Sequence, residues 1–171
     1  TPKERYNDNV AAIRLLFSLE KQGRNATKDE QDILSRYVGW GGLADAFDES
    51  KSNWANEYLE LKSLLSEEEY KSARESTLTS FYTSPVVIES IYKVLNNLGF
   101  RHGNILEPSC GIGNFFGMLP DEMKDSKMYG VELDSISGRI AKQLYQNSNI
   151  AIEGYEETKL PDSFFDVAVG N

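Results

Sequence analysis

The chain has 171 residues, 40% of them hydrophobic, and its 18 basic and 27 acidic side chains give a net charge of −9. No apolar run approaches the roughly 18 residues of a membrane span and no signal segment begins the sequence, so we expect a cytoplasmic protein without a membrane partner. The single cysteine excludes a disulfide framework, and the single histidine cannot build a metal site by itself. The excess of acidic side chains predicts weak affinity for nucleic acid, because the phosphates are also negatively charged.

Residues 1–79 are predicted to form a helical N-terminal extension. Apolar side chains recur at helical spacing over residues 10–19, which indicates a first helix. Thr27 begins a capping box and therefore a second helix. A third helix is expected at residues 53–65, and a fourth, with its own capping box, at residues 66–78.

A Gly39-Trp40-Gly41-Gly42 break separates the second helix from the third. A tryptophan between glycines could stack on a base or on a cofactor. We prefer the simpler interpretation, in which Trp40 is a buried aromatic residue that fixes the turn.

The character of the sequence changes at residue 80, so residues 80–171 are predicted to be a second domain. Phe81-Tyr-Thr-Ser-Pro85 precedes a helix with Ser84 as the expected cap and proline at the first helical position. Apolar side chains then continue at helical spacing as far as Gly99.

Strands and helices alternate after Gly103. Strands are expected at residues 105–106, 128–133, 150–153 and 164–169, and a helix at residues 135–146. This alternation predicts an α/β domain with a parallel sheet and right-handed crossovers. We predict the strand order third, second, first, fourth, with a ligand outside the carboxyl ends of the strands where that order reverses.

The stretch of residues 104–116 is the centre of the functional prediction. It begins as a short apolar strand and then reaches Gly111 and Gly113, a pattern typical of a loop that approaches a ligand closely. Glu107 would repel a pyrophosphate, so it favours a cationic or hydroxyl-rich ligand. The alternative is an ordinary tight turn, because a lone G-x-G is weak evidence. Cys110 has no basic neighbour and is interpreted as a small residue rather than a nucleophile.

Glu132 ends the second predicted strand about 20 residues after the glycines, where an acidic side chain can accept hydrogen bonds from both ribose hydroxyls of a nucleoside. That geometry would serve a nicotinamide cofactor equally well. Asp134 either contributes to this site or simply caps the next helix.

Five ordered motifs carry a resemblance to a known family. The chain resembles the S-adenosylmethionine-dependent DNA methyltransferases that modify the exocyclic amino group of adenine, and more closely the methylase region of large methylase/helicase-like proteins of bacterial mobile elements. The resemblance implies a Rossmann-like sheet in residues 80–171 and S-adenosylmethionine as the cofactor. The motifs are Arg36-Tyr-Val-Gly-Trp-Gly-Gly42, Phe81-Tyr-Thr-Ser-Pro85, Glu107-Pro-Ser-Cys-Gly-Ile-Gly-Asn-Phe115, Tyr129-Gly-Val-Glu-Leu-Asp134 and Asp166-Val-Ala-Val-Gly-Asn171.

The resemblance also implies a set of cofactor contacts. Tyr82 and Thr83 would close over the methionine end of the cofactor, and Leu133 would pack on its adenine. Relatives often place an aspartate where this chain has Tyr155, so either Glu156 or a backbone group reads the cofactor adenine. The full expected set is Tyr82, Thr83, Glu107, Pro108, Ser109, Gly111, Gly113, Asn114, Phe115, Glu132, Leu133 and Glu156.

Asn171 is the expected catalytic residue. In the resembling enzymes this asparagine begins a loop that accepts both amino hydrogens of the target base as the methyl group is transferred, and a later aromatic residue stacks on the flipped base. The remainder of that loop does not follow Asn171 here, so the 171 residues are expected to be inactive by themselves. DNA would be bound by parts of the parent protein outside this chain.

Three functions stay open from the amino-acid sequence alone. The first is the cofactor-binding part of a DNA adenine methyltransferase, in which case the parent protein is an enzyme. The second is a non-catalytic cofactor-binding or structural module of a mobile-element protein. The third is a related amino-methyltransferase that acts on protein glutamine or on RNA.

Overall fold

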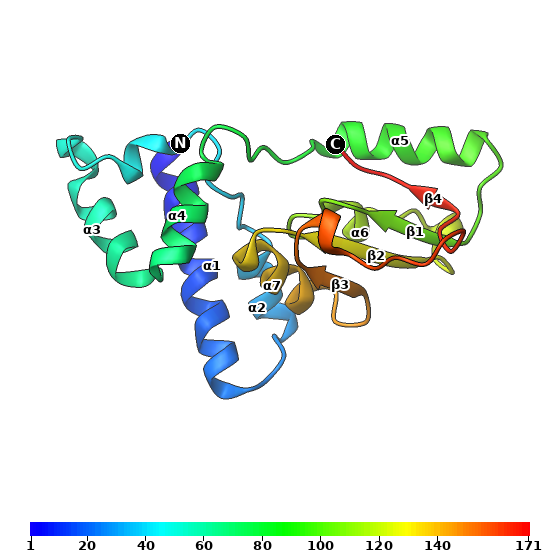
Figure 1. The fold of residues 1–171 in the computed structure, drawn as a ribbon, viewed down its shortest axis with the longest axis horizontal. Coiled ribbons are helices and arrows are strands. Elements are labelled where there is room, and N and C mark those ends of the chain that lie inside the picture. The colour runs from blue at the N-terminus through cyan, green and yellow to red at the C-terminus, as the bar shows by residue number, and fades with distance from the viewer. The chain divides into compact units, whose positions relative to one another are not determined.

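The computed structural model describes all 171 residues and divides the chain into two compact units, Thr1–Tyr82 and Thr83–Asn171. The first unit is helical and the second is α/β (Figure 1). The boundary that we drew from the sequence between residues 79 and 80 lies in the segment that leads from one unit into the other. None of the helices combines the length and the apolar character that crossing a membrane requires.

The first unit contains the four helices expected from the sequence, together with two short 3-10 turns. Capping boxes at Thr27 and Ser66 begin the second and fourth helices as predicted. The fourth helix ends at Ser76 instead of Leu78, because the Ser76 and Thr77 hydroxyls bond to carbonyls of the last turn and so compete with the backbone. The elements are α1 (Pro2–Gln22), α2 (Lys28–Leu34), η1 (Ala44–Phe47), η2 (Ser52–Trp54), α3 (Ala55–Leu64) and α4 (Glu67–Ser76).

Aromatic side chains form the core of the first unit around Trp40. The Trp40 side chain is 2% exposed, and its ring meets those of Tyr6, Tyr37 and Phe47 in edge-to-face contacts. Such pairs add to the stabilisation that burial alone provides. The prediction that Trp40 is a buried aromatic residue is therefore confirmed, and its role in fixing the turn stays a prediction.

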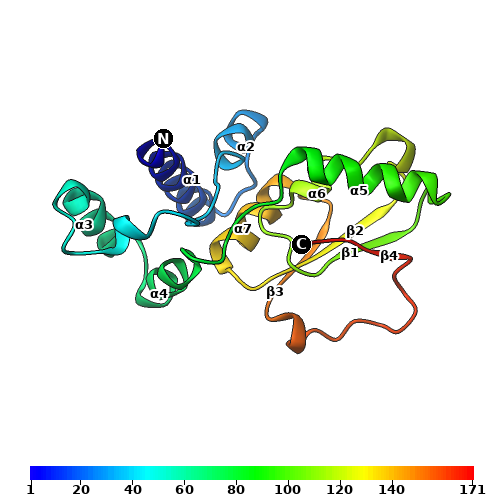
Figure 2. The ribbon, with the colours of Figure 1, turned by 90° about the horizontal axis from the view of Figure 1, so that it is seen from above.

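The second unit contains a parallel four-stranded sheet of order β3-β2-β1-β4, as predicted, and thus a Rossmann-like topology (Figure 2). In the register of the sheet, Ile105 lies opposite Met128 on one neighbouring strand and Val167 on the other. The elements are α5 (Pro85–Asn97), β1 (Asn104–Glu107), α6 (Asn114–Gly117), η3 (Asp121–Met123), β2 (Lys127–Glu132), α7 (Ser135–Leu144), β3 (Asn149–Ile152), η4 (Tyr155–Glu157) and β4 (Val167–Ala168). Ser84 is the N-cap of α5 as predicted, although its side chain makes no capping hydrogen bond.

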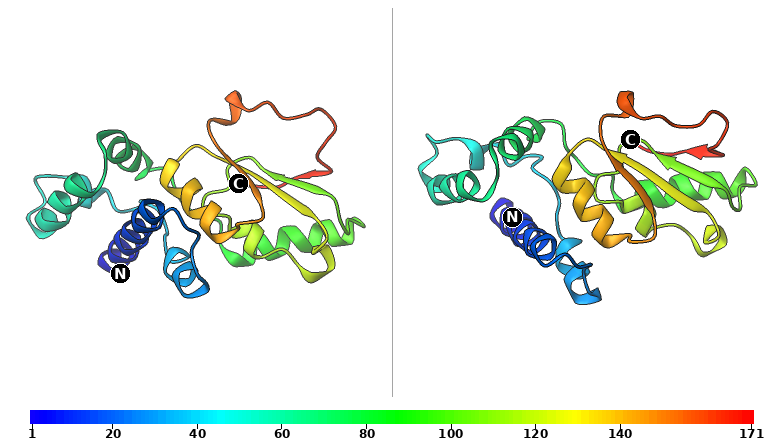
Figure 3. Two further views of the ribbon diagram at one scale, coloured as in Figure 1. Left: turned by 90° about the horizontal axis from the view of Figure 1, so that it is seen from below. Right: turned by 60° about the horizontal axis from the view of Figure 1, so that its bottom comes forward.

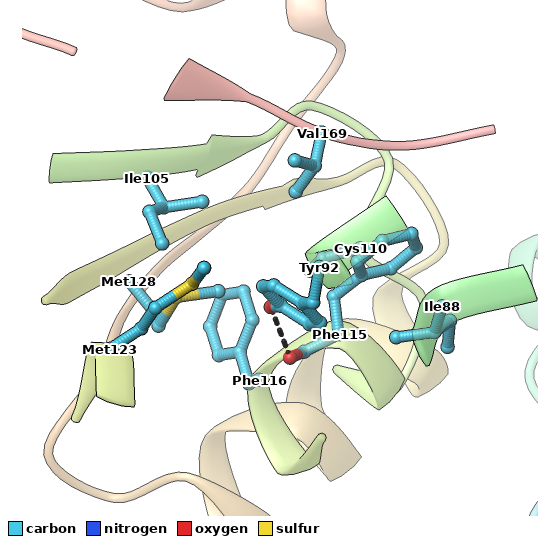
Figure 4. Close-up of a cluster of buried hydrophobic side chains, with 9 residues drawn as sticks. All are labelled: Ile88, Tyr92, Ile105, Cys110, Phe115, Phe116, Met123, Met128 and Val169. Atoms are coloured by element: carbon cyan, nitrogen blue, oxygen red, sulfur yellow. Dashed lines mark hydrogen bonds between the residues drawn. The ribbon is translucent and has the colours of Figure 1, made fainter. Parts of the chain in front are cut away.

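Helices α5 and α6 cover one face of this sheet. Their buried side chains pack with those of the strands in a single cluster, drawn in Figure 4. Within it, the Tyr92 hydroxyl donates a hydrogen bond of 2.6 Å to the Phe115 carbonyl and so fixes α5 to α6. The cluster consists of Ile88, Tyr92, Ile105, Cys110, Phe115, Phe116, Met123, Met128 and Val169.

The connection from β3 to β4 is a long irregular arc, visible in Figure 3, and β4 is much shorter than the predicted strand 164–169. Ser163 has a positive φ of 56°, which interrupts extended structure just before that segment. The rings of Phe164 and Phe165 then pack on Tyr129, each with its centroid 5.3 Å away. Pairing with β1 therefore begins only when the chain reaches Asp166, whose amide donates to the Asn104 carbonyl over 2.9 Å.

Candidate functional site

Glu107 occupies the carboxyl end of β1, and its side chain is 4% exposed. Its Oε2 atom is buried and has no hydrogen-bond partner. Burial, and then the charge of Glu132, raise the pKa of Glu107 from its ordinary 4.5 to about 8. The carboxyl is therefore largely protonated at neutral pH. A buried polar atom without a partner is costly, so Oε2 lacks a hydrogen-bond partner that a ligand would supply.

Glu132 ends the neighbouring strand β2, and its carboxylate ties two loops together. Oε2 accepts from the Gly111 amide over 2.6 Å, and Oε1 accepts from the Asp134 amide over 2.9 Å. Burial nevertheless raises the pKa of Glu132 above its ordinary value. Each carboxylate oxygen has a second lone pair, so Glu132 can hold the glycine loop and still accept from a ligand hydroxyl.

The loop between β1 and α6 needs both of its predicted glycines. Gly111 and Gly113 have positive φ values of 56° and 90°, a region that strains other residues. The Cys110 amide donates to the Val131 carbonyl over 2.9 Å, which fixes the loop to β2. A β-carbon at Gly113 would lie 2.6 Å from Cε2 of Tyr145, so the loop also packs directly on that ring.

A hollow of about 260 Å³ lies beside the loop and brings together two of the predicted contacts, Thr83 and Asn114, with Tyr145. Pro85, Ile88, Gly117 and Met118 complete its lining. Burial, and next the charge of Glu107, raise the pKa of Tyr145. The Tyr145 phenol, which lines this hollow, is therefore within electrostatic reach of the Glu107 carboxyl.

The end of β4 approaches the end of β1. A β-carbon at Gly170 would lie 3.9 Å from Cγ of Glu107 and 3.7 Å from Cδ of Pro108. The chain therefore brings Asn171, the next residue, to the edge of the sheet where Glu107 lies, as expected for parallel strands that end together.

The remaining predicted contacts lie in more varied surroundings. Ser109 is exposed, and the Leu133 side chain is 76% exposed beside Glu132. The Phe115 side chain belongs to the core cluster, which leaves its backbone for any ligand. Glu156 lies in η4 with its carboxylate turned back on Gly154. Tyr82 is the last residue of the first unit, where its hydroxyl lies beside Gly39.

Two residues near the loop have clear structural roles. Oδ2 of Asp134 accepts from the Ser137 amide over 2.8 Å and from the Ser137 hydroxyl over 2.6 Å, so Asp134 caps α7, the simpler of the two expectations. Cys110 is 4% exposed, and burial raises the pKa of its thiol. This agrees with the prediction that Cys110 is not a nucleophile.

Nowhere in the chain do three or more His, Cys, Asp or Glu side chains gather in a way that could hold a metal ion.

Tyr145 was not among the predicted site residues. In the sequence it looks like one more apolar residue of the helix predicted at residues 135–146, whereas α7 ends at Leu144 and Tyr145 is its C-cap. The available signal was the pair Gly113 and Gly117, which leaves one side of α6 bare, because a β-carbon at either position would collide with the Tyr145 ring or hydroxyl. Such a bare side accommodates a large ring from another element.

No family model matches the chain. It is 28% identical over 165 residues to the defense against restriction protein B of Escherichia phage P1, and this match covers 95% of the chain but 6% of the relative. It is 32% identical over 91 residues to the type II methyltransferase M.CvrRI of Paramecium bursaria Chlorella virus XZ-6E, with 53% of the chain and 23% of the relative covered. The chain thus spans less than a quarter of the length of either curated relative.

Among solved structures, the chain is similar to a Listeria monocytogenes protein described as a candidate class I S-adenosylmethionine-dependent methyltransferase. The TM-score is 0.40 at 16% identity, over 98% of this chain and 57% of that one. The parallel sheet and the sequence matches together make this a methyltransferase-like chain.

Proposed function

We propose that this chain is the cofactor-binding part of a DNA adenine amino-methyltransferase that uses S-adenosylmethionine. The observation that carries the proposal is the buried Oε2 atom of Glu107, which has no hydrogen-bond partner and lies beside a glycine loop held by Glu132. Similarity to a type II methyltransferase and the order of the motifs support the same function.

The residues present fit this cofactor. Its methionine end carries an ammonium group, which could donate a hydrogen bond to the unpaired Oε2 atom of Glu107. Because the pKa of Glu107 is about 8 in the free protein, binding of a cation there would expel a proton at neutral pH. Thr83 and Asn114 line the adjoining hollow and would contact the carboxylate of the methionine end.

The ribose and the adenine would lie along the end of β2. Glu132 would accept from the ribose hydroxyls while it keeps the Gly111 amide in place. Leu133, with its exposed side chain, would pack on one face of the adenine. Either Glu156 or a backbone group would read the adenine amino group. Pro108, Ser109 and Gly113 belong to the loop and would make van der Waals contacts with the cofactor.

Asn171 would act on the target base. S-adenosylmethionine supplies an electrophilic methyl group on sulfonium when it is bound. The Asn171 side-chain carbonyl would accept a hydrogen bond from the adenine amino group. The lone pair of the amino nitrogen would thereby stay available to the methyl carbon. Flipping of the base and contacts with DNA would come from other parts of a longer protein. The 171 residues alone are expected to bind cofactor without transferring the methyl group.

A second function keeps specific support. The phage P1 relative, whose match covers 95% of the chain, is named for defense against restriction and not for methyl transfer. Tyr155, which replaces the aspartate expected at that position, is 53% exposed in the structure. A module that binds the cofactor without catalysis would account for both observations.

Calorimetry with S-adenosylmethionine and with NAD tests the proposed cofactor. We expect S-adenosylmethionine to bind and NAD not to, because a pyrophosphate offers no cation to the buried Glu107 carboxyl. Tighter binding of NAD would contradict the proposal. Methyl transfer to adenine-containing DNA by a longer protein that includes this chain would then separate the enzyme from the non-catalytic module. Transfer to protein or to RNA, with none to DNA, would contradict the proposed substrate.

A further inference from the structure

Tyr145 lies outside all the motifs from which the function was predicted, yet its side chain lines the hollow beside the glycine loop. Its ring fills the space that two glycines leave. A β-carbon at Gly113 would lie 2.6 Å from Cε2 of the ring, and one at Gly117 would collide with the hydroxyl oxygen. The Phe116 ring also packs on it, with the two centroids 5.6 Å apart. Packing within the α/β unit therefore sets the position of the Tyr145 hydroxyl.

The hollow offers hydrogen-bond donors and no ionised side chain. Three of its lining residues carry an uncharged donor, namely Thr83, Asn114 and Tyr145. Pro85 and Ile88 also line it, and both belong to the first turn of α5. The N-terminal end of a helix carries a positive partial charge, and the N-cap residue of α5 makes no side-chain capping hydrogen bond. These surroundings suit a small anionic group such as a carboxylate.

The Tyr145 phenol can act as a donor at neutral pH. Burial, and then the charge of Glu107, raise its pKa, so the phenol keeps its proton. Neither of these causes is a hydrogen bond. The charge of Glu107 also raises the pKa of Tyr92, but the Tyr92 hydroxyl already donates to the Phe115 carbonyl over 2.6 Å. Of these two phenols, Tyr145 is therefore the one that can serve a ligand.

Tyr145 and Glu107 together match the two charges of an α-amino acid. Its ammonium and its carboxylate are bonded to the same carbon atom, so the groups that bind them must lie close to each other. The Oε2 atom of Glu107 is an acceptor without a partner, and Tyr145 is within electrostatic reach of this carboxyl. A carboxyl for the ammonium and a protonated phenol for the carboxylate form a complementary pair.

We propose that Tyr145 is a specificity-determining residue of the cofactor site, whose hydroxyl donates a hydrogen bond to the carboxylate of the methionine end of S-adenosylmethionine. This inference rests on the proposed function, which supplies the cofactor, and adds a residue that none of the motifs contains. The protein should therefore distinguish S-adenosylmethionine from decarboxylated S-adenosylmethionine, which keeps the sulfonium and the ammonium but lacks the carboxylate.

Tyr145→Phe is the most direct test, because it removes the hydroxyl and keeps the ring that packs on the glycine loop. Tyr129→Phe is the matched control, since Tyr129 lies in the same unit but packs on Phe164 and Phe165 and does not line the hollow. By calorimetry we expect Tyr145→Phe to weaken binding of S-adenosylmethionine about tenfold, and that of the decarboxylated cofactor less than about twofold. Tyr129→Phe should change neither affinity.

The pair of cofactors separates recognition from a structural role. If the Tyr145 hydroxyl only held the glycine loop in place, its loss would weaken both cofactors by the same factor, and that result would overturn the inference. The unsubstituted protein gives a second test, in which the decarboxylated cofactor should bind at least about tenfold more weakly than S-adenosylmethionine. Equal affinity for the two would overturn the inference even if Tyr145→Phe failed to fold, which denaturant unfolding would reveal.

The outcomes also separate this inference from the proposed function. If the unsubstituted protein binds S-adenosylmethionine and not NAD, the proposed cofactor stands whatever Tyr145→Phe does. Equal losses for the two cofactors in Tyr145→Phe, or no loss for either, would then overturn the inference alone. If the unsubstituted protein binds neither form of the cofactor, the proposed function fails, and the inference that rests on it is overturned with it.

Discussion

The two units of this chain bury polar side chains in opposite ways. In the helical unit, Asn9 is fully buried and both of its polar side-chain atoms have a partner, because Nδ2 donates to the Gly39 carbonyl and Oδ1 accepts from the Val38 amide. In the α/β unit, Glu107 is almost as deeply buried, and its Oε2 has no partner. The first arrangement holds a turn in place, and the second leaves a strong hydrogen-bonding atom for something outside the chain.

Burial alone therefore does not indicate a binding site. The Trp40 Nε1 atom is also buried without a partner, in the helical unit. An indole N–H is neutral and does not titrate, whereas Glu107 gains a charge as its proton leaves, and a charge costs far more to bury. An unpaired group that can change its charge next to a glycine loop is therefore the stronger indication of a ligand.

The largest expected effect is on cofactor binding by Glu132→Ala. This substitution removes the proposed ribose acceptor and also the acceptor that holds the Gly111 amide. We expect affinity for S-adenosylmethionine to fall at least about a hundredfold, measured by calorimetry. Glu157→Ala, a change of an exposed glutamate, is the control and should leave affinity unchanged. Equal affinity of both variants would remove Glu132 from the site.

Asn9→Ala should produce the next largest effect, on stability. It leaves the buried Gly39 carbonyl and the partly buried Val38 amide without their partner. We expect the free energy of unfolding to fall by about 2–4 kcal/mol, by the same amount at acidic and at neutral pH, because no titrating group is involved. Denaturant unfolding at several pH values checks this. A loss that varied with pH would mean that the pairing of Asn9 is coupled to a charge.

Glu107→Gln should change stability by an amount that depends on pH. The pKa of Glu107 is about 8 in the folded chain against an ordinary 4.5, so the folded state holds a proton that the unfolded state releases between these values. The stabilising contribution of that proton is fully present below pH 4.5 and is lost as the pH rises through 8. Relative to the variant, the unsubstituted chain should lose about 1 kcal/mol per pH unit in this window. Parallel stability curves would contradict the raised pKa.

The sequence predicted the fold well because the fold depends on patterns that the sequence carries. Two helix starts were predictable from the capping boxes at Thr27 and Ser66. The parallel sheet and its strand order were predictable from the alternation of strands with helices after Gly103. The length of β4 was not predictable, because it depends on the φ of Ser163 and on rings that pack on Tyr129.

The candidate site was predictable in part. Parallel strands end at one edge of a sheet, so the neighbourhood of Glu107, Glu132 and the glycine loop followed from the motif positions. Hydrophobic periodicity shows which side of α7 is buried but not what Tyr145 meets there. The missing partner of the Glu107 Oε2 atom is a property of packing that no local pattern encodes. The roles of these residues toward a cofactor stay predictions.

Proton release on cofactor binding tests the central claim most directly. Calorimetric titrations with S-adenosylmethionine, carried out at about pH 6.5 in buffers of different ionisation enthalpy, give the number of protons released. If the cofactor ammonium pairs with Glu107, the unsubstituted chain should release about one proton per cofactor, and Glu107→Gln should bind more weakly and release none. Tight binding without proton release by the unsubstituted chain would contradict the account, because the buried Glu107 carboxyl would then have kept its proton and taken no part in holding the cation.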